Sequence, residues 1–189
     1  MGALNDFAGW VRRRPALRKT AKLLVRMIPD REVTLNKPEV GKIRIRMRSH
    51  RWLLWERFLQ DDGLMLGVFD RLVHEGDVVY DIGANIGLYA RVLPQWFGAK
   101  MVAAFEPMSQ NFELLRQNVA LGKLDAKVRM FQMALSDVNG EEDLQIDDMN
   151  SGEAVLNSVS HGEASGGRKE WGLPPKTERV KVRTLDDVV

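Results

Sequence analysis

The sequence contains no cysteine and no long apolar run. Its 189 residues therefore provide no disulfide scaffold, no cysteine-ligated zinc site and no thiol nucleophile. No apolar stretch approaches the length of a membrane span, and the basic amino terminus lacks the continuous apolar core of a secretory signal. None of the three histidines lies in a cluster with metal-ligand spacing. We therefore expect a cytoplasmic globular protein and predict no metal site.

The charge is unevenly distributed, although the net charge is only +2. Residues 1–57 contain fifteen lysines and arginines against five acidic residues, whereas residues 58–189 contain thirteen against twenty-one. Within the basic part, residues 16–28 have the spacing of a basic amphipathic helix. Residues 10–28 are interpreted either as a helix docked on the chain itself or on a second subunit, or as a contact with an anionic membrane surface. Because no recognition module accompanies the charge, we expect no nucleic acid partner.

The central part of the chain alternates between strand and helix patterns. A strand with one face toward solvent is predicted over residues 43–48, and helix over most of residues 51–73. Three apolar strands with intervening helices follow, with strands at 77–82, 101–105 and 127–135 and helices at 86–97 and from Ser109 to Gly122. This order predicts an α/β fold with a parallel sheet and helices on both faces.

Several local signals refine this outline. Pro94 is expected to bend or end its helix, and Ser109 is the expected N-cap of the next helix. Asn139-Gly140 is a turn signal between two extended runs, residues 150–175 have loop composition, and residues 179–184 alternate as a strand. We divide the chain into a basic helical lead-in with a short strand (1–74) and a cofactor-binding part (75–189).

The most informative segment joins the first apolar strand to its helix. Asp81 ends the strand, and the turn reads Gly83-Ala84-Asn85-Ile86-Gly87. Glycine permits a tight turn and close packing of the helix near the strand, and free amides at a helix start favour polar or anionic groups. Glu106 ends the next strand, where a carboxylate can accept both hydroxyls of an adenosine ribose. The combination predicts a nucleotide-type cofactor.

The turn also discriminates between cofactors. A dinucleotide site normally has glycine at the third position of the turn, to clear space for a pyrophosphate, and here Asn85 carries a side chain. A cofactor without phosphates, such as S-adenosylmethionine, fits better, and Asp81 could receive its ammonium group or brace the loop. An NAD(P)-dependent oxidoreductase is the alternative.

Three motifs taken together resemble the FkbM-type family of S-adenosylmethionine-dependent methyltransferases. They begin at Asp81, Ala104 and Leu114, and the later segments Ala134–Asp137, Asn150–Gly152 and Val182–Asp187 match in order. The resemblance implies a class I methyltransferase (Rossmann-like) fold. It also implies an enzyme that methylates a hydroxyl of a small molecule or saccharide. By position, the methionine end would be lined by Asp81, Gly83, Ala84, Asn85 and Gly87. Glu106 would hold the ribose, Pro107 would shape the next loop, and Ala134 and Leu135 would lie near the adenine.

The chain departs from this family at its carboxyl end, because it stops at Val189 before the expected acidic strand motif. We therefore expect an incomplete sheet, and a truncated non-catalytic relative is a further alternative. No catalytic base can be named. His50 and His74 are predicted to face solvent, His161 could lie near an acceptor, and Asp147-Asp148 and Asp186-Asp187 are predicted to be turn and cap residues.

Overall fold

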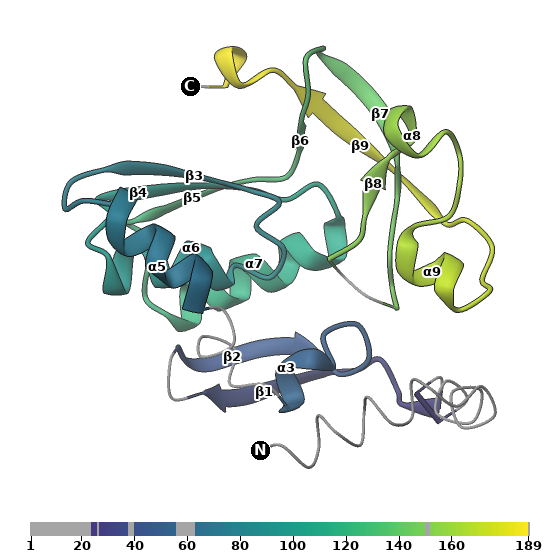
Figure 1. The fold of residues 1–189 in the computed structure, drawn as a ribbon, viewed down its shortest axis with the longest axis horizontal. Helices are drawn as coiled ribbons and strands as arrows, with labels where there is room; N and C mark the ends of the chain where they lie inside the picture. Colours follow the sequence, from purple (N-terminus) through teal and green to yellow (C-terminus); the bar gives the residue numbers. More distant parts are fainter. Residues whose placement is uncertain (1–23, 26, 38–39, 56–62, 150–151, 189) are drawn as a thin grey trace.

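The computed structural model describes residues 24–25, 27–37, 40–55, 63–149 and 152–188. Figure 1 shows three stacked layers in this part of the chain: a parallel sheet, a layer of helices and an antiparallel hairpin. A second sheet extends from one end of the first. Within the described ranges, no helix is long and apolar enough to span a membrane. Most of the predicted amphipathic helix lies outside the described residues.

The hairpin comes first in the chain. It pairs β1 (Glu32–Lys37) with β2 (Gly41–Arg46), and a turn leads to the short helix α3 (Trp52–Trp55). Ile43 and Ile45 are fully buried and share one apolar cluster with Ile86 and Leu114 of the following α/β unit. The hairpin and that unit therefore have a common core. The division of the chain at residue 74 stays a prediction.

The α/β unit follows the predicted alternation of strands and helices. Its elements, in chain order, are α5 (Gly63–Leu72), β3 (Val78–Ile82), α6 (Leu88–Trp96), β4 (Met101–Phe105), α7 (Ser109–Leu121) and β5 (Val128–Phe131). The strands are parallel in the order β3-β4-β5, with Val79 opposite Val102 and Val102 opposite Val128. This arrangement confirms the α/β class and the parallel sheet.

The prediction of helices on both faces is wrong for the described residues. Helices α5, α6 and α7 all lie on one side of the sheet (Figure 1). The strand order explains this, because β3, β4 and β5 advance across the sheet in one direction and right-handed crossovers then fall on one face. The opposite face exposes Val78, Tyr80 and Ile82 of β3.

The predicted third strand, residues 127–135, is divided between two sheets. Its first part is β5, and its last two residues form β6 (Ala134–Leu135) in the second sheet. That sheet has the order β6-β9-β7-β8, with β7 (Gly140–Gln145), β8 (Val155–Leu156) and β9 (Thr177–Arg183). Because β9 lies between β6 and β7, the Asn139-Gly140 turn does not join neighbouring strands. The strand predicted at 179–184 is confirmed.

Three smaller predictions also need correction. Pro94 was expected to bend or end its helix; it does not end α6, which continues to Trp96 with Pro94 buried, and the bend stays a prediction. Ser109 is the first residue of α7 rather than its N-cap, and its backbone N–H donates to the carboxylate of Glu178 at 3.1 Å. Residues 150–175 are not only loop, since they include β8 and the short helices α8 (Asn157–Ser160) and α9 (Gly166–Glu170). After β9 the chain ends in a 3₁₀ turn, η1 (Leu185–Asp187).

Candidate cofactor site

The turn between β3 and α6 has a left-handed backbone at three positions. The φ angles are 81° at Gly83, 51° at Asn85 and 82° at Gly87. The backbone N–H groups of Gly83 and Ala84 both donate to the carbonyl of Phe105 at 2.9 Å, which holds the turn against the end of β4. A Cβ at Gly87 would lie 2.4 Å from the Cδ1 atom of Leu115. Gly87 therefore permits close packing against α7, rather than against the strand as predicted.

Asp81 carries an acceptor that the described residues leave unused. Its Oδ2 atom is buried and has no hydrogen-bond partner among them. Burial raises the pKa of Asp81 to about 6, and a backbone hydrogen bond from Ala90 opposes this rise. A buried carboxylate oxygen without a donor is costly for the fold and can be satisfied by a cationic ligand group. This observation fits the ammonium end of S-adenosylmethionine.

Glu106 lies across the same turn from Asp81. Its Oε2 atom accepts from the backbone N–H of Asn85 at 2.8 Å and its Oε1 atom from that of Met108 at 2.9 Å. Burial raises the pKa of Glu106 to about 7, while these amides and Asn111 act in the opposite direction. Each carboxylate oxygen has a second lone pair. The two amide contacts thus orient the carboxylate and leave it able to accept ribose hydroxyls.

The remaining predicted residues belong to the loop after β4 and to β6. Pro107 borders a cavity of about 280 Å³ between the loop after β4 and the second sheet, whose other lining residues include Gln132 and Glu178. Ala134 is buried in one cluster with Met108, two residues after Glu106. Leu135 follows Ala134 in β6. The role of each predicted residue toward the cofactor stays a prediction.

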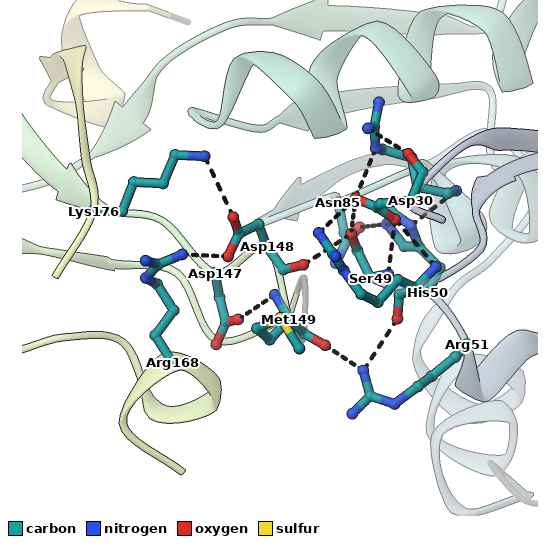
Figure 2. Close-up of polar contacts among 12 residues, drawn as sticks. Asp30, Ser49, His50, Arg51, Asn85, Asp147, Asp148, Met149, Arg168 and Lys176 are labelled. Carbon is teal, nitrogen blue, oxygen red and sulfur yellow. Dashed lines mark hydrogen bonds and ion pairs between the residues drawn. The ribbon is translucent and has the colours of Figure 1, made fainter. Parts of the chain in front are cut away.

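His50 lies in this region, contrary to prediction. It was expected to face solvent, but its side chain is fully buried and its Nε2 atom lies 3.3 Å from Oδ1 of Asn85 (Figure 2). The local pattern offered no signal, because the contact joins residues 35 positions apart. His74 is exposed as predicted, beside Asp77 at 3.7 Å. His161 is exposed, and its suggested proximity to an acceptor stays a prediction.

Asp147 and Asp148 were both predicted to be turn and cap residues; Asp147 bonds to backbone amides, whereas Asp148 forms ion pairs. Asp147 accepts from the backbone N–H of Met149 at 2.9 Å and from that of Gly167, in the first turn of α9, at 2.7 Å. Asp148 forms ion pairs with Arg168 and with Lys176 (Figure 2). Its pKa is lowered because these cations outweigh its partial burial.

Comparison with known proteins identifies the type of domain. Residues 67–156 match the model of the TRM5/TYW2 methyltransferase domain, a segment that begins in α5 and ends with β8. This segment includes Asp81, the glycine turn and Glu106. No curated protein matches the chain at a significant level.

Three solved structures match part of the chain. TYW2 from M. jannaschii in complex with AdoMet is 19% identical, with a TM-score of 0.44 over 63% of this chain and 48% of that one. TYW2 from P. horikoshii in complex with MeSAdo is 24% identical, with a TM-score of 0.34 over 39% and 28%. The tRNA m1G37 methyltransferase from M. jannaschii is 17% identical, with a TM-score of 0.40 over 58% and 34%. The chain thus spans less than half the length of each.

The family match corrects two expectations and confirms others. The resemblance to the FkbM-type family is wrong, because the model that matches is the TRM5/TYW2 domain. The expectation of a small-molecule or saccharide acceptor with no nucleic acid partner is also wrong, because the matched TRM5/TYW2 family methylates tRNA. S-adenosylmethionine is confirmed as the cofactor, and the oxidoreductase alternative has no support. Residues 67–156 are part of an S-adenosylmethionine-dependent methyltransferase domain.

Proposed function

We propose that this protein transfers a methyl group from S-adenosylmethionine to a nucleotide of tRNA. The observation that carries the proposal is the match of residues 67–156 to the TRM5/TYW2 methyltransferase domain. The matched segment includes both buried carboxylates that flank the turn between β3 and α6. The sulfonium of the cofactor would supply a methyl group, whose bond to sulfur breaks as a nucleophilic atom of the acceptor bonds to its carbon.

The cofactor would be held by groups that the fold already orients. Asp81 would receive the ammonium group at its unpartnered Oδ2 atom, in a site where burial strengthens a charge-assisted hydrogen bond. Glu106 would accept the ribose hydroxyls with a carboxylate fixed by two backbone amides. Pro107 would shape the loop after Glu106, and Ala134 and Leu135 would border the adenine. Transfer would then depend mainly on positioning of the acceptor rather than on a dedicated base.

The acceptor class is supported by charge as well as by the family match. The first 57 residues carry the excess of lysine and arginine, and the remainder of the chain is acidic. Basic residues neutralise phosphates and release counterions, so binding through them weakens steeply with salt. This excess of basic residues in the first 57 positions suits a substrate with a phosphate backbone.

Two measurements test the proposal. Calorimetry with S-adenosylmethionine and S-adenosylhomocysteine should show binding, and Asp81→Asn should weaken it by roughly tenfold to a hundredfold because one charged hydrogen bond is lost. Transfer of a radiolabelled methyl group to unmodified tRNA should be detected, and it should fall as salt rises.

Glu113→Gln is the matched control, because Glu113 is an exposed carboxylate of α7 that pairs with Arg116 away from the turn. It should bind cofactor as the wild type does. Absence of cofactor binding would contradict the whole proposal. Cofactor binding without label in tRNA would contradict the acceptor and favour a non-catalytic relative.

A further inference from the structure

We propose that His50 is a positioning residue of the cofactor site, acting through Asn85 on Glu106; the inference rests on the proposed function. His50 belongs to the turn after β2, outside the segment that matches the methyltransferase domain. Its buried ring lies beside the turn between β3 and α6, as Figure 2 shows. The hairpin would thus supply a part of the site.

The contacts of the ring define its tautomer. The backbone N–H of Arg46 lies 3.2 Å from Nδ1 of His50, so Nδ1 is the acceptor. The ring proton is then on Nε2, which donates to Oδ1 of Asn85 at 3.3 Å. Burial lowers the pKa of His50 to about 4, which keeps the ring neutral and this pattern intact near neutral pH.

Asn85 connects His50 to Glu106, the carboxylate proposed to hold the ribose of the cofactor. Its backbone is left-handed, with φ 51°, a conformation that asparagine adopts more often than most residues with a side chain. In this conformation its backbone N–H donates to Oε2 of Glu106 at 2.8 Å. A hydrogen bond to the side chain of Asn85 therefore stabilises the backbone geometry that orients Glu106.

The turn that carries His50 is itself fixed. Asp30 accepts at Oδ1 from the backbone N–H groups of Arg48 and Ser49, at 3.1 and 3.2 Å, and at Oδ2 from the hydroxyl of Ser49 at 2.9 Å. The side chain of Arg46 donates to the same carboxylate at 3.1 Å. His50 consequently acts from a turn with little freedom (Figure 2).

A second contact ties the hairpin to the next residue of the same turn. Asn118 of α7 accepts from the backbone N–H of Arg44 at 2.6 Å and donates to the carbonyl of Arg44 at 3.0 Å. Its amide also donates to the carbonyl of Ile86 at 2.9 Å. Asn85 is therefore held by the turn after β2, and Ile86 is linked to β2 through Asn118 of α7. Both contacts agree with a positioning role for this part of the chain.

Two substitutions separate positioning from general structural damage. His50→Asn retains an acceptor near Nδ1 for Arg46 but cannot reach Asn85, whereas His50→Gln places an amide N–H near Nε2. We expect His50→Asn to weaken binding of S-adenosylhomocysteine by about tenfold, and His50→Gln to stay within about threefold of wild type. Equal affinity of wild type and His50→Asn would overturn the inference, as would equal weakening by both variants.

A double-mutant cycle with Asn85→Gly completes the test, because glycine tolerates the left-handed backbone but offers no side-chain acceptor. His50→Asn should change affinity by less than about twofold in the Asn85→Gly background. The same cycle in urea should show coupling of about fivefold in the unfolding equilibrium constant. Additive effects in unfolding would overturn the inference even if the wild type binds no cofactor, an outcome that would separately refute the proposed function.

Discussion

The two faces of the parallel sheet contrast sharply, although the strands are apolar on both. On the covered face, Val102 and Val128 are buried in one cluster with Leu115 of α7. On the open face, Tyr80 and Ile82 of β3 are exposed. Because side chains alternate along a strand, residue composition alone does not determine which face is covered. The direction in which the strands advance places both crossover helices on one side.

The largest effect should come from removing packing on the covered face. Leu115→Ala should destabilise the protein by about 2–5 kcal/mol, because it removes a fully buried side chain and leaves a cavity. Ile82→Ala on the open face should cost less than about 1 kcal/mol, since that side chain is 61% exposed. Urea unfolding monitored by circular dichroism measures both. Similar losses would mean that the open face is covered in solution.

Gly83 and Gly87 of the turn have almost the same φ angle but different surroundings, and the next largest effect is expected there. Gly87→Ala should cost about 2–4 kcal/mol, because it adds left-handed strain to a clash with Leu115. Gly83→Ala should cost about 1–2 kcal/mol from strain alone, because a Cβ there would meet no atom within 4 Å. Thermal unfolding of both variants provides the test, and a larger loss for Gly83→Ala would contradict the packing role of Gly87.

The parts of this site that were predictable from sequence are those that local patterns encode. Asp81, the glycine turn and Glu106 were found because each follows directly from a strand end, and parallel strands bring such ends together. The burial of His50 was missed because it depends on where the hairpin docks. That docking is specified by pairs distant in sequence, such as Asn118 with Arg44, which no periodicity reveals.

The covered side of the sheet also contains an unfavourable charge, which provides the smallest expected effect. Burial raises the folded-state pKa of Asp81 from 3.8 to about 6. Between these values the folded state binds more protons than the unfolded state, so the contribution of Asp81 to stability falls as pH rises. Asp81→Asn should therefore be more stable than wild type above pH 6, by about 1–3 kcal/mol, with no difference near pH 4. Urea unfolding across this pH range measures the difference.

His50 titrates in the same range with the opposite sign, because its pKa is lowered to about 4. Its contribution to stability increases with pH and is common to both proteins, so it cancels in the difference between Asp81→Asn and wild type. Asp125→Asn is the control, because it makes the same change at an exposed position. A pH-independent gain for Asp81→Asn would contradict desolvation as its cause. If the stability gain of Asp81→Asn disappears when S-adenosylhomocysteine is added, the ligand satisfies the Asp81 carboxylate. The burial of that carboxylate then destabilises only the protein without ligand.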